Sequence, residues 1–159
     1  MTPRLDPAVV SPALYKKFLE LSMALRHSAI DAKTQDLVNI RASQINGCAF
    51  CVDMHSKEAK IHGERELRLY HIAIWRESPL FDARERAVLT WTEAVTKLGE
   101  HGVPQSIFDE VRASLSEQEI ADLTFAVMAI NGWNRLSIAF QAVPGSKDAE
   151  YGLAKAGLS

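Results

Sequence analysis

Helical spacing of apolar residues is the feature that most limits what this chain can fold into. Apolar side chains recur every three or four residues along nearly all of its 159 residues. No stretch alternates at period two for long enough to predict a sheet. The sequence therefore predicts an all-α fold, a single-domain bundle of six or seven helices over residues 1–159.

Caps and stop signals set the boundaries of the predicted helices. A serine or aspartate before a helical stretch accepts hydrogen bonds from its first turn, and glycine or proline ends it. On these signals we expect helices to start at Ser11, Asp31, Cys48, Glu64, Asp82, Pro104 and Ser116. The fourth is expected to run to about Arg76. The core is expected over about residues 10–145, and the weakly patterned tail 146–159 is expected to be partly mobile.

The last predicted helix, from Ile120 to Phe140, is apolar on more than one side. Residues Phe125–Ile130 are consecutively apolar. A helix of this kind lies at the centre of a bundle or in a subunit interface, and a small helical protein can complete its core by association. We therefore expect a homo-oligomer.

Composition excludes several classes of function. Hydrophobic residues make up 47% of the chain and charged residues 24%, which is typical of a soluble globular protein. The net charge of -2 excludes the broad basic surface of a nucleic-acid-binding protein, and no apolar run approaches the roughly 20 residues that span a bilayer. Residues 1–7 lack the apolar segment and cleavage site of a signal peptide. We therefore expect a cytoplasmic protein with no nucleic-acid or membrane partner.

The chain has only two cysteines, Cys48 and Cys51, and His55 follows four residues after the second. On a helix these three side chains fall within about 60° of one another. In a reducing compartment a CxxC pair is more often catalytic or metal-binding than structural. The start of a helix favours the thiolate of Cys48, whereas His55 is better placed to take the proton of Cys51. The residues thus predict a redox site and leave open which sulfur attacks first.

Three more specific interpretations of this pair must be weighed. A thioredoxin-like site requires a strand before the cysteines, and the segment here is helical. Zinc could take Cys48, Cys51, His55 and His62, but structural zinc sites usually draw ligands from two segments. Finally, the cysteines could be small buried side chains and His55 a hydrogen-bonded helix residue. We expect no metal and no cofactor.

Residues Arg41–His55 resemble the core motif of the AhpD-like alkylhydroperoxidases, in the carboxymuconolactone decarboxylase superfamily. Trp75–Pro79, Glu85–Thr96 and Asn131–Leu136 are also similar, and the resemblance covers roughly residues 10 to 145. It implies an all-helical fold that assembles into trimers or hexamers. It also implies reduction of organic hydroperoxides through the cysteine pair, with regeneration by an external dithiol.

The resemblance also implies roles for individual residues. Cys51 would form the sulfenic acid, and Cys48 would donate a proton and then resolve it as a disulfide. His55 would belong to a proton relay. The relay glutamate of the best-studied members corresponds to Asp36, which is one methylene shorter, and a relay histidine of that branch corresponds to Phe50. Decarboxylase members do not rely on a CxxC pair, so its presence argues against lactone decarboxylation.

The sequence therefore predicts a thiol-dependent peroxidase. A redox-responsive interaction protein and a general thiol–disulfide reductase are the alternatives. Among the other matched residues, the three tryptophans are expected in the core or an interface. Asn134 and Arg135 are expected to make structural hydrogen bonds, for example to Glu93.

Overall fold

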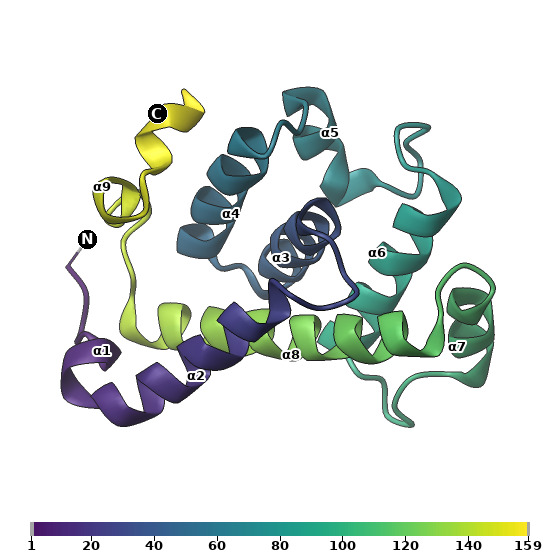
Figure 1. The fold of residues 1–159 in the computed structure, drawn as a ribbon, viewed down its shortest axis with the longest axis horizontal. Helices are drawn as coiled ribbons and strands as arrows, with labels where there is room; N and C mark the ends of the chain where they lie inside the picture. The colour runs from purple at the N-terminus through teal and green to yellow at the C-terminus, as the bar shows by residue number, and fades with distance from the viewer. Residues whose placement is uncertain (1, 159) are drawn as a thin grey trace.

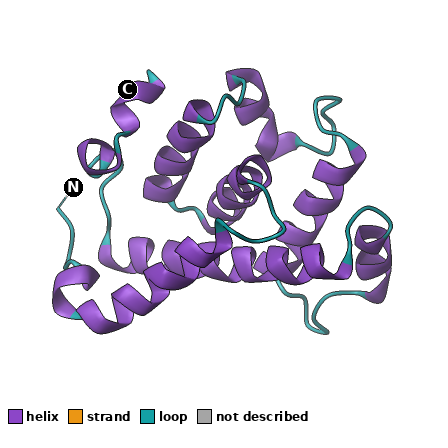
Figure 2. Cartoon of the chain, viewed as in Figure 1, coloured by secondary structure: helices purple, strands orange, loops and turns teal. Residues whose placement is uncertain are grey.

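The computed structural model describes residues 2–158, and these residues form helices joined by loops and no strand (Figure 1, Figure 2). The α-helices are α1 Pro7–Val10, α2 Pro12–Leu25, α3 Ala32–Asn46, α4 Ala49–Ile61, α5 Glu66–His71, α6 Ala83–Thr96, α7 Gln105–Arg112, α8 Glu117–Phe140 and α9 Asp148–Tyr151. Two 3₁₀ turns, η1 Ile72–Ile74 and η2 Leu153–Ala156, complete the set. The all-α prediction is confirmed. The helix count over these residues exceeds the predicted six or seven because the short α1 and α9 were not expected.

The predicted caps are mostly confirmed. Asp31 accepts a hydrogen bond from the first turn of α3, and Asp82 and Ser116 each form a capping box with the glutamate three residues later. Ser11 occupies the cap position of α2, but its side chain makes no capping hydrogen bond. The start of α2 therefore depends on Pro12, whose fixed φ suits the first helical turn.

The helix predicted from Glu64 to Arg76 is shorter in the structure. It comprises α5 and η1 and ends at Ile74. Beyond η1 the chain wraps around the side chain of Arg86, which donates to the backbone carbonyls of Arg76 and Phe81 at 3.2 and 3.1 Å, and to that of Ser78. Because these carbonyls accept hydrogen bonds from the Arg86 guanidinium and not from helical N–H groups, the segment after Ile74 forms a loop and does not continue the helix.

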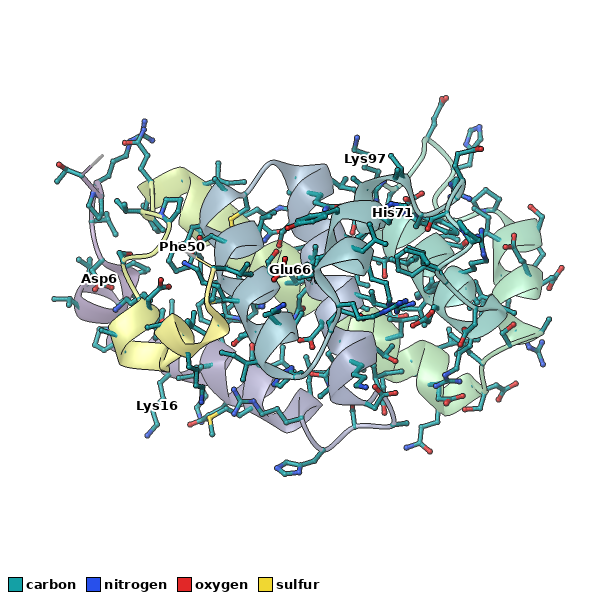
Figure 3. All side chains as sticks on the ribbon, turned by 90° about the horizontal axis from the view of Figure 1, so that it is seen from above. Asp6, Lys16, Phe50, Glu66, His71 and Lys97 are labelled. Carbon is teal, nitrogen blue, oxygen red and sulfur yellow. A yellow bond between two sulfur atoms is a disulfide. The ribbon has the colours of Figure 1, made fainter. Side chains whose placement is uncertain are left out.

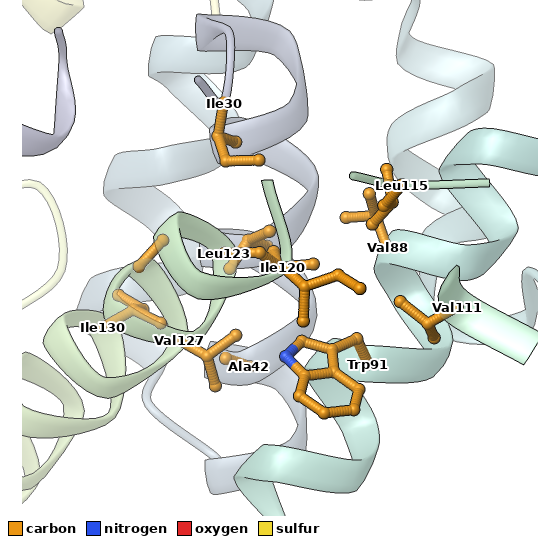
Figure 4. Close-up of a cluster of buried hydrophobic side chains, with 12 residues drawn as sticks. Ile30, Ala42, Val88, Trp91, Val111, Leu115, Ile120, Leu123, Val127 and Ile130 are labelled. Atoms are coloured by element: carbon orange, nitrogen blue, oxygen red, sulfur yellow. The ribbon is translucent and has the colours of Figure 1, made fainter. Parts of the chain in front are cut away.

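Helix α3 lies at the centre of the fold and packs against α4, α6 and α8 (Figure 1). One group of buried apolar side chains joins α3, α6, α7 and α8, and includes Val88, Leu123 and Val127 (Figure 4). A second group joins α3 to α5, η1 and the start of α6. Burial of each large aliphatic side chain stabilises the fold by about 1.5–3 kcal/mol. These contacts hold α3, and with it the start of α4, in place.

The tryptophans lie where the sequence predicts. Trp75 and Trp91 are buried in the second and first of these groups, respectively. Trp133 is partly buried, and its ring packs 4.5 Å from that of Phe18, between centroids. Helix α8 buries Leu123 and Val127 but leaves Phe125 and Met128 on its outer side, 51% and 56% exposed. Association of subunits through this side stays a prediction.

The tail after residue 145 is more ordered than the sequence predicts. Helix α9 and turn η2 lie beside α4 (Figure 1), with Leu153 and Ala156 buried against the rest of the protein. The ammonium group of Lys57 on α4 bonds the carboxylates of Asp148 at 2.7 Å and Asp53 at 3.0 Å. The tail is therefore part of the folded structure, and it covers one side of the cysteine helix.

No helix within residues 2–158 is both long and apolar enough to cross a bilayer.

Candidate redox site

The two cysteines stand at the start of α4, directly after the turn that ends α3. Gly47 closes α3 in the left-handed conformation, with φ +70°, and Cys48 then caps α4 with an extended backbone. The Sγ atom of Cys48 accepts a hydrogen bond from the backbone N–H of Cys51 at 3.3 Å. The two sulfurs form a disulfide between Cα atoms 5.3 Å apart, and each cysteine is only 1% exposed. The pair thus closes a disulfide within one helical turn, out of contact with bulk water.

A buried amide network fixes the turn before Cys48 against α8. The side chain of Asn46 donates to the side-chain oxygens of Asn131 at 3.0 Å and Asn134 at 2.8 Å. Asn134 is fully buried and donates in turn to the hydroxyl of Ser43 at 2.9 Å. A buried amide left without partners would cost about 1–3 kcal/mol. The network therefore holds the turn before Cys48 against α8. The structural hydrogen bonding predicted for Asn134 is confirmed.

Glu93 is not the hydrogen-bond partner of Asn134 or Arg135, although the sequence suggested it as an example of such a partner. Its carboxylate instead accepts hydrogen bonds from the Trp75 indole at 2.7 Å, Arg76 at 2.7 Å and Arg41 at 2.8 Å. Burial opposes the charge of Glu93, but these hydrogen bonds outweigh it and lower its pKa. The example was wrong because Glu93 lies on the side of α6 that faces η1 and Arg41, whereas Arg135 binds the neighbouring Asn131 on α8.

A row of reactive side chains follows the cysteines along α4. Cys51, His55, Glu58 and His62 are spaced by four, three and four residues, so they lie within about 60° on one face of the helix. The Nδ1 atom of His55 lies 2.6 Å from a carboxylate oxygen of Glu58. Because Glu58 takes Nδ1, Nε2 is the ring nitrogen left for proton exchange with a sulfur. Glu58 was not among the residues predicted from the sequence.

Asp36 lies on α3 and faces the same row, but its hydrogen bond goes to His62. A carboxylate oxygen of Asp36 is 2.7 Å from the Nδ1 atom of His62. The resemblance implies a relay of Asp36 with His55; the structure instead pairs Asp36 with His62 and His55 with Glu58. The two pairs belong to one cluster, since the charges of Glu58 and His55 both act on the pKa of Asp36.

The pKa values of the two carboxylates in this cluster shift in opposite directions. Burial raises the pKa of Asp36 to about 6, against the opposing hydrogen bond and charge of His62. Burial also opposes the charge of Glu58, but there the hydrogen bond and charge of His55, with further help from His62 and Arg26, lower the pKa. Glu58 therefore stays ionised near neutral pH and holds the His55 ring, while Asp36 titrates close to the range of an imidazole.

Glu58 and His62 could have been recognised from the sequence by the same test that grouped Cys51 with His55. Extending the helical row by three and then four residues reaches both side chains. Spacing alone, however, does not reveal that Asp36 pairs with His62, because that contact depends on how α3 and α4 pack.

An open pocket of about 550 Å³ lies on the other side of the cysteine pair. Its lining is mostly apolar and includes Gly47, Cys48, Val52 and Pro144. Cys51 is not part of this lining. Phe50, on α4 between the cysteines (Figure 3), is partly buried. The pocket therefore borders the Cys48 side of the pair, and the row of titratable groups follows Cys51 along α4.

Within residues 2–158, no three His, Cys, Asp or Glu side chains are arranged to hold a metal ion.

The chain belongs to the carboxymuconolactone decarboxylase family. The family model matches residues 12–94. The uncharacterized protein YdfG of Bacillus subtilis strain 168 is 35% identical over 139 residues, which cover 87% of this chain and 95% of YdfG. Together with the fold, these matches identify an AhpD-like member of the family.

Solved structures of similar fold carry different functional descriptions. ATU0492 from Agrobacterium tumefaciens, a protein of unknown function described as a candidate antioxidant defence protein AhpD, has a TM-score of 0.87 and 40% identity. The match covers 90% of this chain and 98% of ATU0492. The debrominase Bmp8 has a TM-score of 0.77 at 18% identity, over 91% of this chain and 77% of Bmp8, and shares the fold alone. Function must therefore be argued from the site.

Proposed function

We propose that this protein is a thiol-dependent peroxidase that reduces organic hydroperoxides through Cys48 and Cys51. The observation that carries the proposal is a buried cysteine pair, able to form a disulfide, at the head of a helical row that contains the His55–Glu58 pair. Family membership and the similarity to ATU0492 support a peroxidase-related activity. The family resemblance assigns the attack on the peroxide to Cys51.

The first step oxidises Cys51. His55 accepts the thiol proton, and the thiolate attacks one peroxide oxygen, so that an S–O bond forms while the O–O bond breaks. The alkoxide leaves as an alcohol after taking a proton from His55. Glu58 supports both transfers, because its negative charge stabilises the imidazolium that forms between them.

The second step resolves the sulfenic acid. The Cys48 thiol gives up its proton, its thiolate attacks the sulfur of Cys51, and an S–S bond forms while the S–O bond breaks; the leaving hydroxide takes up the proton and departs as water. The N–H of Cys51 already points at the Cys48 sulfur, and the start of α4 adds a favourable dipole. Both features favour the Cys48 thiolate that this step needs. An external dithiol then reduces the disulfide, and the pocket beside Cys48 is its access route in this proposal.

The experiment that tests the proposal is stopped-flow reaction of the reduced protein with an organic hydroperoxide. We expect two thiols to be lost per hydroperoxide, faster than in free dithiothreitol at equal pH. Cys51→Ser should abolish the reaction, whereas Cys48→Ser should still consume one peroxide and leave a sulfenic acid that a dimedone probe labels. Thiol loss no faster than in free dithiothreitol would contradict the proposal.

A general thiol–disulfide reductase is the second candidate, and the pairing of Asp36 with His62 rather than His55 favours it. Such an enzyme would reduce a model disulfide at least as well as a hydroperoxide, which a side-by-side turnover assay measures. We also propose that the protein acts in the cytoplasm as a homo-oligomer, a trimer or hexamer, associating through the exposed apolar side of α8. Sedimentation of the wild type and a Phe125→Ser variant would test this assembly.

A further inference from the structure

Reduction of the disulfide creates a need for protons inside the protein. Breaking the bond with two electrons gives two thiolates, each of which takes up one proton to become a thiol. Both cysteines are 1% exposed. The pocket has Cys48 in its lining but not Cys51, so neighbouring protein groups offer the Cys51 sulfur a route for its proton.

The cluster on α4 and α3 extends from beside Cys51 to the surface. His55 and Asp36 are nearly buried, with side chains 10% and 8% exposed, and Glu58 is 29% exposed. The side chain of His62 is 45% exposed, so it meets water directly. Within each pair the two side chains are hydrogen-bonded, His55 to Glu58 at 2.6 Å and His62 to Asp36 at 2.7 Å. Glu58 and His62 lie four residues apart on the same face of α4, and the charge of His62 acts on Glu58, which links the two pairs.

We propose that the His62–Asp36 pair is the solvent end of a proton route that serves Cys51 through Glu58 and His55. This inference rests on the proposed redox function and adds residues to it. His62 takes a proton from water, Asp36 and Glu58 carry it between the imidazoles, and His55 delivers it to the Cys51 thiolate. Neither His62 nor Asp36 touches a sulfur, so both act through His55 as positioning residues.

The other groups around this cluster do not exchange protons near neutral pH. Arg26, at the end of α2, is permanently charged and lies near Glu58. Tyr151, on α9, is also close to Glu58; burial and the neighbouring Tyr15 raise the pKa of Tyr151 to about 12. Glu58, which is itself partly exposed, Asp36 and the more exposed His62 are therefore the groups of this cluster that can pass protons between bulk water and His55.

The reducing step balances without any further reactant. One thiolate of the external dithiol attacks the disulfide, an S–S bond to the dithiol forms, and one cysteine leaves as a thiolate. The second thiol of the donor attacks this mixed disulfide and releases the other cysteine. The donor is oxidised by two electrons and loses two protons to water, and the cysteines gain both. A Cys51 thiolate that is not protonated attacks back and reverses the step, so slow proton delivery slows net reduction.

The test is reduction of the oxidised full-length protein by excess dithiothreitol at pH 7 in dilute buffer, followed by alkylation and mass spectrometry. We expect His62→Ala to slow reduction about tenfold, less than the loss of a direct acid–base group. Added imidazole should restore the rate to within about twofold of wild type, because it replaces the missing proton carrier. His71→Ala is the matched control, since His71 bonds Ser78 outside the cluster, and its rate should not change.

A His62→Ala rate equal to wild type in dilute buffer would overturn the proposal. A slow rate that imidazole leaves unchanged would overturn it too, because the residue would then have only a structural role. Asp36→Asn gives a second reading and should slow reduction in the same conditions. The assay contains no peroxide, so its outcome is independent of whether the protein reduces hydroperoxides.

Discussion

Helix α4 carries two polar clusters on different faces, and they differ in what their charges can do. One joins Lys57 to Asp53 and Asp148 and fastens the tail to the helix. The other pairs His55 with Glu58 and contacts Asp36 through His62. Both contain buried charged side chains, yet only the second contains a carboxyl group whose pKa is raised to about 6. Under the proposed function, charged groups on this one helix serve attachment on one face and proton exchange on the other.

The pKa values express this difference. Burial works against the charge of Lys57, but hydrogen bonds to Asp148 and Asp53 outweigh it and raise the pKa of the ammonium group. Lys57 therefore stays charged throughout the physiological range. In contrast, Asp36 has a pKa of about 6 because burial dominates its environment. The following predictions test this contrast, from the largest expected effect to the smallest.

The largest effect is expected from Asp36→Asn on the pH dependence of stability. The pKa of Asp36 is 3.8 in the unfolded chain and about 6 when folded. A raised folded pKa means that the stability from the protonated carboxyl is complete below pH 4 and is lost as pH rises to 6. Relative to wild type, Asp36→Asn should therefore gain up to about 3 kcal/mol in unfolding free energy between pH 4 and pH 6. Urea denaturation at several pH values measures this gain.

Asp109→Asn provides the control for that experiment. Asp109 is exposed, so its variant should follow the wild-type pH dependence. A parallel course of Asp36→Asn and wild type would contradict the raised pKa.

The second effect is the loss of the cation that fastens the tail. Lys57→Met leaves Asp53 and Asp148 without their shared partner and should cost about 2 kcal/mol, below the usual value for a fully buried pair because water still reaches both carboxylates. Lys60→Met, on the same helix, breaks only the solvent-exposed pair with Glu66 and should cost much less, because water screens this pair. Urea denaturation measures both costs, and equal values would show that the tail is not fastened in this way.

The third effect concerns the orientation of His55. Glu58→Gln keeps a hydrogen bond to the Nδ1 side of the ring but removes the charge that stabilises the imidazolium. We expect the rate of thiol loss with a hydroperoxide to fall about tenfold and its pH profile to shift. Glu66→Gln, which removes a surface charge at the start of α5, should leave the rate and its pH profile unchanged.

Much of this arrangement could be predicted because it depends on local spacing. The caps at Asp31, Asp82 and Ser116 and the stop at Gly47 follow from nearby residues alone. The same holds for the placement of Cys48, Cys51 and His55 on one helical face. The structure confirms these elements, while the chemical roles of the residues stay predictions.

The parts that could not be predicted depend on contacts between distant segments. Asp36 meets His62 because α3 and α4 fold back on each other from the Gly47 turn, which brings the start of α3 level with the end of α4. The order of the tail depends on Lys57 reaching Asp148, 91 residues away in sequence. The early end of the helix after Ile74 depends on Arg86. The spacing of residues along the sequence does not predict contacts of this kind.

The most direct test of the account compares thiol loss with an organic hydroperoxide in wild type, His55→Gln and Lys57→Met at the same pH. We predict that His55→Gln slows the reaction about 100-fold, as expected for loss of an acid–base group, while Lys57→Met stays within about twofold of wild type. The claim that only one face of α4 serves the cysteines would be contradicted by either of two results. One is a His55→Gln rate equal to that of the wild type, and the other is equal slowing by both variants.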